Sequence, residues 1–276
     1  MRVARFRHQG TTRTGIVRRE EIAPVGGGVL DTLAAGKAEP AGPTVPVSEV
    51  ELLAPIAQPP KFLAIGLNYA DHLAETGMET PEFPLFFNKQ RTCVIGPNQP
   101  IHVPRISDKV DYEGELGIVI GRRCRHVPAE RAVEVIAGYT VINDVTVQDW
   151  QWRSPTMTLG KSFDTHGPTG PWIVSADEVP DPHDLRIRTW VNQDLLQDAS
   201  TKEMIFDCYD QIATLSTAFT LEPGDLVSTG TPAGVGFART PPRFLKAGDT
   251  VRIEIDGIGA IENPVIDEPA DTAVPG

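Results

Sequence analysis

Cysteine is scarce in this sequence. Cys93, Cys124 and Cys208 are the only three in 276 residues, and they stand far apart. They form no CxxC motif and no cysteine-histidine pair with the spacing of a zinc site. We therefore expect buried structural thiols and no zinc centre.

Long apolar runs are also missing. No stretch approaches the roughly 20 apolar residues that a membrane-spanning helix needs, and no apolar run follows the basic residues Arg2, Arg5 and Arg7 at the start of the sequence. A secretory signal is therefore not expected. We predict a soluble cytoplasmic protein with no membrane partner.

Positive charge is in the minority. The sequence has 25 lysines and arginines against 37 aspartates and glutamates, a formal net charge of -12. Nucleic-acid binding depends on basic residues that neutralise phosphates, so no nucleic-acid partner is expected. Long-range repulsion also opposes anionic substrates, and binding of an anion must then depend on a local cation, either a metal or a well-placed lysine or arginine.

Several common catalytic motifs are absent. Gly160-Lys161-Ser162 resembles the end of a phosphate-binding loop, but Pro155 stands where that motif needs its first glycine. Gly26-Gly27-Gly28 lacks the last glycine of a dinucleotide fingerprint, because Asp31 occupies that place. There is no GxSxG or HExxH motif. The chemistry must come from a less regular arrangement.

The organisation of the chain favours a strand-rich α+β fold. Residues 1–60 read as a small N-terminal domain of short strands and turns, residues 61–265 as the main domain, and residues 266–276 as a loose tail. Helical spacing predicts helices over 68–75, 129–136 and 208–219. Residues 250–255, followed by Asp256-Gly257 and another apolar run, predict a hairpin.

Two glutamates stand at alternate positions of a predicted strand over 110–120. A period of two places Glu113 and Glu115 on one face, and Asp144 follows the apolar residues 140–142. Three carboxylates around one point suit a hard cation such as Mg²⁺, Mn²⁺ or Ca²⁺. Spacing alone leaves two alternatives open: a solvated strand face, and a helix cap made by Asn143 or Asp144.

A histidine and a glutamate three residues apart form a second candidate group. His72 and Glu75 lie on one face of the predicted helix, where the carboxylate can orient the imidazole as a general base. Lys161, predicted in a loop, has an ammonium group that can face a developing oxyanion. The alternatives are an exposed pair on a surface helix and a solvated lysine.

Five ordered segments together resemble the fumarylacetoacetate hydrolase family, over about residues 61–265. They are Gly66-Leu67-Asn68-Tyr69-Ala70-Asp71-His72, Asp111-Tyr112-Glu113-Gly114-Glu115-Leu116, Asn143-Asp144 through Asp149-Trp150-Gln151, Gly160-Lys161-Ser162-Phe163-Asp164-Thr165, and Thr229-Gly230-Thr231-Pro232-Ala233-Gly234-Val235-Gly236. Each is modest alone, but five in this order are specific.

The resemblance implies a mixed β-roll, usually in a homodimer, with Mg²⁺ or Mn²⁺ on the positions of Glu113, Glu115 and Asp144. The family's His/Glu dyad falls on His72 and Glu75, its catalytic lysine on Lys161, and its substrate-facing residues on Gln151 and Thr231. One position departs from the pattern. Many members carry arginine four residues after the metal aspartate, where this sequence has Gln148, and this leaves the charge or polarity of the substrate open.

The function that we expect from the resemblance is that of its acylpyruvase and diketo-acid hydrolase branch. Such an enzyme cleaves a carbon-carbon bond in a 2,4-dioxo acid, for example an acylpyruvate, fumarylpyruvate or a 2,4-diketo-3-deoxy sugar acid, to pyruvate and a carboxylic acid. The same site could instead serve an oxaloacetate decarboxylase or a 2-oxo acid isomerase or tautomerase. A non-catalytic, metal-stabilised binding module is a second alternative.

Overall fold

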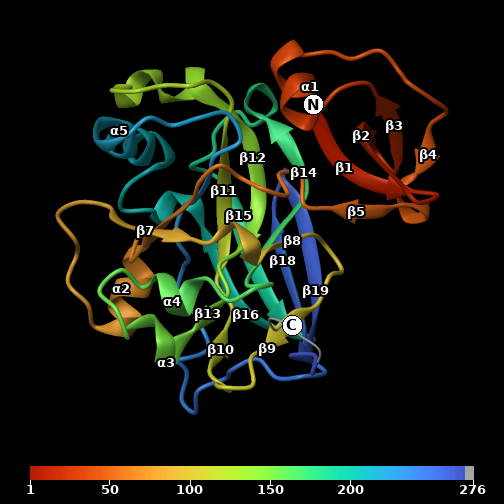
Figure 1. Cartoon of the computed structure of the whole chain (residues 1–276). Coiled ribbons are helices and arrows are strands. Elements are labelled where there is room, and N and C mark those ends of the chain that lie inside the picture. Colours follow the sequence, from red (N-terminus) through yellow and green to blue (C-terminus); the bar gives the residue numbers. More distant parts are fainter. Residues whose placement is uncertain (271–276) are drawn as a thin grey trace, which may run out of the picture.

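The computed structural model describes residues 1–270, and strands dominate it. The main sheet has 12 strands, most of them in the order β4-β3-β2-β1-β14-β12-β11-β17-β6-β7, with β5 beside β1 and β8 beside β14 (Figure 1). Its strands are β1 (Arg2–His8), β2 (Thr11–Arg18), β3 (Glu21–Val25), β4 (Val45–Pro46), β5 (Glu51–Leu53), β6 (Phe62–Gly66), β7 (Leu85–Lys89), β8 (Val94–Ile95), β11 (Gly114–Ile120), β12 (Ile136–Asn143), β14 (Gly167–Ser175) and β17 (Leu226–Ser228). The predicted strand-rich α+β roll is confirmed.

A second sheet of five strands packs against the first, in the order β16-β15-β18-β19-β9. Its strands are β9 (Ile101–Val103), β15 (Arg186–Val191), β16 (Asp194–Ser200), β18 (Thr250–Ile255) and β19 (Gly259–Asp267). Ile255 pairs with Gly259 across the predicted hairpin, and Gly257 has the positive φ of 79° that such a tight turn favours. Because β19 extends to Asp267, the expected tail from residue 266 begins inside a strand. Residues 271–276 of that tail lie outside the described part.

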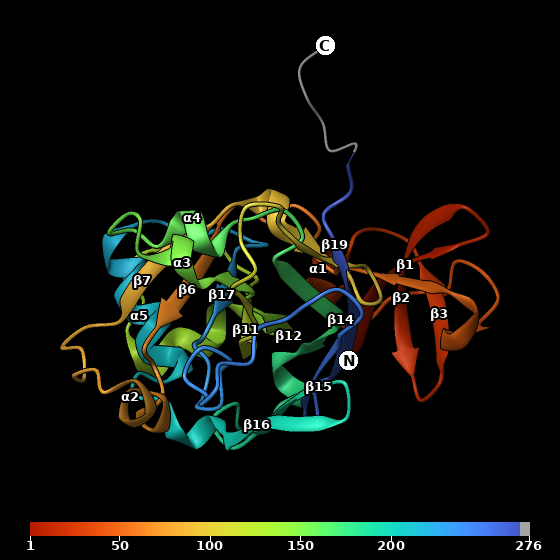
Figure 2. The same ribbon diagram turned by 90° about the horizontal axis from the view of Figure 1, so that it is seen from below.

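The N-terminal region is joined to the rest by backbone hydrogen bonds. It contains β1 to β5 and α1 (Val29–Ala35). Both views show it on one side of the molecule (Figures 1 and 2). β1 pairs antiparallel with β14, with Arg2 opposite Val174, so the main sheet runs from the small region into the large one.

The predicted strand over 110–120 is interrupted. β10 (Val110–Asp111) pairs with β13 (Thr146–Val147) in a small separate sheet, whereas β11 pairs with β12 and β17 in the main sheet. The chain therefore changes partner sheets at Tyr112 and Glu113. Along β11 the alternation holds, because Leu116 and Ile118 enter the main hydrophobic core and Val119 enters a second cluster on the opposite face.

Helices cover the edges of the roll. The regular helices are α2 (Ala70–Thr76), α3 (Gln148–Gln151), α4 (Thr158–Lys161) and α5 (Cys208–Ala218), and the 3₁₀ segments are η1 (Val47–Glu49), η2 (Arg91–Cys93), η3 (Ala129–Val135), η4 (Ala176–Glu178) and η5 (Thr201–Glu203). Gly77 ends α2 with a φ of 68°, and the Asp207 side chain caps α5, as helix-terminus chemistry favours. The predicted α-helix over 129–136 is instead the 3₁₀ segment η3, which contains two β-branched valines and buries only Ala132.

The three cysteines are free thiols. Cys93 and Cys208 are buried and Cys124 is half-buried, so the expected burial holds fully for two of them. In the described part of the chain, no helix combines the length and the apolar character that crossing a bilayer requires.

Candidate metal centre and active site

Three carboxylates from two neighbouring strands meet beneath a pocket. Glu113 precedes β11, Glu115 lies in it, and Asp144 follows β12, with one ligand atom of each within 4.8 Å of the others. The three residues are 7%, 1% and 1% exposed, so this is not a solvated strand face. The helix-cap alternative also fails, because α3 begins only at Gln148, with Val147 at its N-cap.

Hydrogen bonds orient the two glutamates. The Thr146 hydroxyl donates to Glu113 Oε1 at 2.7 Å. Glu115 Oε2 accepts from the Ser228 hydroxyl at 2.6 Å and from the Gly230 amide at 2.8 Å. Because these donors come from β13, β17 and the loop after β17, folding of the roll aims both carboxylates at one point.

Two buried lysines neutralise part of this charge. Lys161 Nζ donates to Glu113 Oε2 at 2.6 Å and to Asp144 Oδ2 at 2.9 Å. Lys89 Nζ lies 2.5 Å from Asp144 Oδ1. Lys161 was expected in a loop as a possible solvated charge, but it is the buried last residue of α4.

The pKa values in the cluster reflect this arrangement. Burial raises the pKa of Glu115 well above its usual value, and the nearby Asp144 and Glu113 raise it further. For Asp144 burial alone would raise the pKa, but Lys161 and Lys89 bring it below its usual value. Burial would lower the pKa of Lys161, yet Asp144 and Glu113 raise it above the ordinary lysine range. Glu115 is thus the carboxylate of the cluster that forms no ion pair with either lysine.

The residues fit a divalent cation. Three carboxylates against two ammonium groups leave one excess negative charge in a buried place, and the raised pKa of Glu115 is the cost of that excess. Carboxylate oxygens are the donors that hard cations prefer. Glu113, Glu115 and Asp144 would hold such an ion, with Lys161 paired to Glu113 and Asp144 and Lys89 paired to Asp144.

The predicted base and its orienting acid lie together on α2. His72 Nδ1 is 3.2 Å from Glu75 Oε1, and Glu75 Oε2 accepts the Gly234 amide at 2.8 Å. His72 is only 7% exposed, so the pair is not a solvated surface pair. A carboxylate on Nδ1 favours the tautomer that carries its proton there, which leaves Nε2 as the basic nitrogen.

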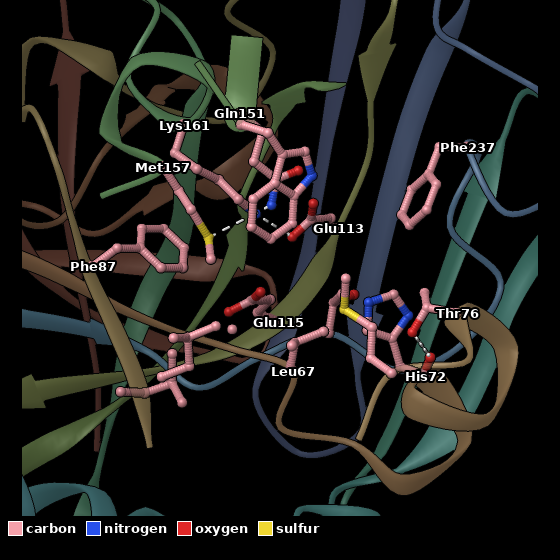
Figure 3. Close-up of a pocket in the computed structure, with 16 residues that line it drawn as sticks. Leu67, His72, Thr76, Phe87, Glu113, Glu115, Gln151, Met157, Lys161 and Phe237 are labelled. Atoms are coloured by element: carbon pink, nitrogen blue, oxygen red, sulfur yellow. Dashed lines mark hydrogen bonds and ion pairs between the residues drawn. The ribbon is translucent and has the colours of Figure 1, made fainter. Parts of the chain in front are cut away.

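Both groups contribute side chains to the same pocket. Its volume is about 120 Å³, and its walls include His72, Glu113, Glu115 and Lys161. Figure 3 shows Lys161 and Gln151 on one side of the cavity, His72 and Phe237 on the other, and Glu113 between them. A pocket this small, below the roughly 300–1,000 Å³ of drug-sized sites, suits a compact ligand.

The two predicted substrate-facing residues also line the pocket. Gln151 Nε2 contacts the Met157 sulfur at 3.7 Å, and because a thioether is a weak acceptor, the amide keeps donor capacity for a ligand. The Thr231 hydroxyl donates to the Gly114 carbonyl at 3.0 Å and accepts from Gln197 Nε2 at 2.8 Å. Its proton is therefore already used, and Thr231 can offer a ligand only a lone pair.

Gln148, which stands in place of the family's arginine, is not among the residues that line the pocket. Its Nε2 donates to Asp111 Oδ2 at 3.1 Å. Asp111 also accepts the amides of Gly236 and Phe237, so Gln148 supports the loop that carries one wall of the pocket. Burial raises the pKa of Asp111 to about 7.

Sequence reasoning missed the residues that support the site, above all Lys89. The sequence did carry a signal for it. Side chains alternate between the two faces of a strand, so Lys89 shares the inward face of β7 with Leu85 and Phe87. Asn143, whose side chain accepts the Glu113 amide at 3.0 Å, was considered only as a marker or a cap. Gln197, which joins Gly114 to Thr231, lies in no motif.

Fold and site together define a protein class: a β-roll with a buried acidic cluster suited to a divalent metal. Comparison with known proteins identifies the family. Residues 61–266 match the model of the fumarylacetoacetate (FAA) hydrolase C-terminal domain, and residues 1–55 match a model described as Rv2993c-like, N-terminal. The chain therefore belongs to the fumarylacetoacetate hydrolase family.

Individual relatives differ in their reactions. The chain is 48% identical over 221 residues to the mitochondrial oxaloacetate tautomerase fahd2 of Xenopus laevis, which covers 79% of this chain and 69% of the relative. It resembles 5-carboxymethyl-2-hydroxymuconate delta-isomerase from Mycobacterium smegmatis with a TM-score of 0.85 and 38% identity. The match covers 97% of this chain and 100% of the isomerase. It also resembles maleylpyruvate hydrolase from Sphingobium sp. SYK-6, solved in complex with manganese(II) and pyruvate. The TM-score is 0.79 and the identity 32%, and the match covers 98% of this chain and 100% of the hydrolase. The family thus contains hydrolases, isomerases and a tautomerase, and the manganese-bound neighbour agrees with a divalent metal at the acidic cluster.

Proposed function

We propose that this protein is a divalent-metal-dependent hydrolase that cleaves a 2,4-dioxo acid to pyruvate and a carboxylic acid. One observation carries the proposal: Glu113 and Glu115 of the acidic cluster line a single small pocket together with His72, which Glu75 contacts. The cluster suits the 2-oxo acid end of a substrate. The imidazole on the other side suits a water molecule that attacks the distal ketone.

The chain's own residues account for the proton transfers. When bound, a divalent cation would supply positive charge to the carboxylate and 2-oxo oxygens of the substrate. His72, oriented by Glu75, takes a proton from water while the water oxygen bonds to carbon 4. The bond between carbons 3 and 4 breaks, its electron pair passes to carbon 3, and His72 returns the proton there. The products are a carboxylic acid and pyruvate.

Lys161 is placed to stabilise the negative charge that develops on the pyruvate half. An ammonium group has three N–H donors, and Glu113 and Asp144 take two of them, so one remains for a ligand. Gln151 supplies a second donor in the same half of the pocket. Mg²⁺ and Mn²⁺ are the proposed ions, and the manganese-bound hydrolase neighbour supports the latter.

Tautomerisation of a 2-oxo acid is the second candidate. It is favoured by the 48% identity to an oxaloacetate tautomerase. The same histidine and lysine would move a proton between carbon 3 and the 2-oxo oxygen, with no attacking water and no broken carbon-carbon bond. Decarboxylation of oxaloacetate would pass through a related enolate.

A substrate panel separates these reactions. The purified protein is incubated with Mg²⁺ or Mn²⁺, and then with EDTA, against acetylpyruvate, fumarylpyruvate, a 2,4-dioxo-3-deoxy sugar acid and oxaloacetate, while pyruvate release and keto-enol absorbance are followed. Hydrolysis predicts metal-dependent pyruvate from a dioxo acid, lost in Glu113→Gln and retained in the matched control Glu20→Gln, an exposed residue of the N-terminal region.

Other outcomes contradict the hydrolase proposal. Pyruvate from oxaloacetate alone would indicate a decarboxylase, and keto-enol conversion of oxaloacetate without pyruvate would indicate a tautomerase. Metal binding without turnover of any compound would favour the non-catalytic module.

A further inference from the structure

Beside the acidic cluster, much of the pocket lining is apolar. Leu67, Met78, Leu85, Trp152 and Phe237 belong to it. Apart from Glu113, Glu115 and Lys161, the polar side chains of the lining are His72, Thr76, Gln151 and Thr231, and His72 is bound to Glu75 through Nδ1.

Three of these apolar side chains are exposed to solvent. Met78, Trp152 and Phe237 have exposed fractions of 42%, 58% and 37%. Exposed apolar residues scattered singly need no explanation, but residues gathered on one pocket indicate a surface that a ligand covers. An apolar group of the substrate would bury them.

No cation is placed to receive a second carboxylate. Among the described residues that line the pocket, Lys161 is the only lysine or arginine, and it is bound to Glu113 and Asp144. Gln148 replaces the arginine that many family members carry, and it faces Asp111. A distal carboxylate would instead lie in a pocket whose His72 is already paired with the carboxylate of Glu75, on a protein of net charge -12. An anion desolvated without a partner is strongly disfavoured.

We propose that the substrate carries one carboxylate, at its 2-oxo end, and that its acyl arm is uncharged and apolar, either aliphatic or aromatic. This inference rests on the proposed function, because that function places the 2-oxo acid at the acidic cluster. It distinguishes the protein from relatives whose names specify dicarboxylic compounds such as oxaloacetate and maleylpyruvate.

Equilibrium binding tests the inference without turnover. We would titrate the manganese-loaded protein by calorimetry with 2-oxohexanoate and with 2-oxoadipate, which have six carbons each and differ in the distal carboxylate. Neither has the 4-oxo group that hydrolysis needs. We expect 2-oxohexanoate to bind at least about tenfold more tightly. Equal or tighter binding of 2-oxoadipate would overturn the inference.

A charge introduced at the wall provides the second test. Met78→Lys should shift the ratio of the two dissociation constants toward 2-oxoadipate by about two- to fivefold, the range of an exposed ion pair. Met78→Gln removes the same apolar contact without adding charge. It should weaken the binding of 2-oxohexanoate and leave the binding of 2-oxoadipate unchanged. Phe83→Lys adds the same charge at an exposed residue that does not line the pocket, and it should leave the ratio unchanged.

The two proposals fail in different ways. Absence of pyruvate from every dioxo acid would overturn hydrolysis, while the calorimetric ratio would still decide the charge of the arm. Conversely, efficient release of pyruvate from fumarylpyruvate, with kcat/KM above that for benzoylpyruvate, would support hydrolysis and overturn the apolar arm.

Discussion

The two sides of the pocket are built differently. The acidic side lies on strands of the roll, with carboxylates and lysines that are almost completely buried and hydrogen-bonded to one another. The apolar side comprises Met78, Trp152 and Phe237, whose side chains are partly exposed. Burial and mutual contacts leave the acidic side few alternative arrangements, whereas exposed side chains can change without disturbing the core. The acidic side therefore suits chemistry shared across a family, and the apolar side suits selectivity.

Removing an acid from the buried side should have the largest effect. Asp144→Ala leaves Lys89 and Lys161 without their shared carboxylate. We expect the free energy of unfolding to fall by about 3–5 kcal/mol, the cost of a buried charge that loses its partner. Urea denaturation in EDTA measures this change, and manganese binding should be lost as well.

Asp198→Ala is the matched control, since Asp198 pairs with Arg186 at the surface. It should leave manganese binding intact and change stability far less. If Asp144→Ala were no less stable than this control, the buried ion pairs would not hold the acidic side together.

Removing the proposed general base, His72, should lower the catalytic rate without changing the affinity for the metal ion. His72→Ala is expected to lower kcat by about 10²–10⁴-fold, the usual contribution of general acid-base catalysis. Steady-state kinetics on the best dioxo acid, together with calorimetric titration of Mn²⁺, would check both statements. Full turnover in this variant would remove His72 from the mechanism.

Acid should weaken the fold through a histidine behind the acidic side. Burial lowers the pKa of His166 from 6.5 to about 3 in the folded protein. Since the unfolded chain binds this proton more readily, stability is complete above pH 6.5 and falls as the pH decreases toward 3. Between pH 7 and pH 5, His166 should cost about 2 kcal/mol of unfolding free energy.

His166→Gln isolates this effect, because an amide can still donate to the His102 carbonyl that His166 contacts at 2.8 Å. Urea denaturation at the two pH values should show a smaller loss in the variant. An equal loss would mean that His166 is not held neutral.

Substitutions on the apolar side should have the smallest effects on activity and stability. Trp152→Ala is expected to raise KM for an apolar acylpyruvate by about tenfold, because the acyl arm loses its apolar contact with the indole ring. The kcat, the manganese affinity and the unfolding free energy should change little, since Trp152 is more than half exposed. A variant that lost manganese binding would contradict the division between the two sides.

Local patterns predicted much of the fold. The helix at α2, its end at Gly77, the helix at α5 and the β18–β19 hairpin follow from spacing and turn residues, which act between neighbours in the chain. The break at Tyr112 and Glu113 did not follow, because it depends on which strands pair on either side. The 3₁₀ form of η3 was missed because helical spacing takes no account of its two β-branched valines and its single buried side chain.

The candidate site divides in the same way. The ordered motifs named Glu113, Glu115, Asp144, His72, Glu75 and Lys161. In the structure Glu113, Glu115, His72 and Lys161 line one pocket, and Asp144 and Glu75 contact these lining residues. Their roles in binding and catalysis remain predictions. Lys89 and Gln197 carry no motif, since their importance arises only from what lies across the sheet.

By itself the sequence determined the strand-rich class, the family and the residue types available for chemistry, because these depend on composition, spacing and ordered motifs. Only the tertiary structure decided that Lys89 joins Lys161 at Asp144, that Gln148 faces Asp111, and that Met78, Trp152 and Phe237 line one pocket. The physical reason is that charge neutralisation and ligand selectivity depend on distances between segments far apart in the chain. Those distances are established only when the strands pair.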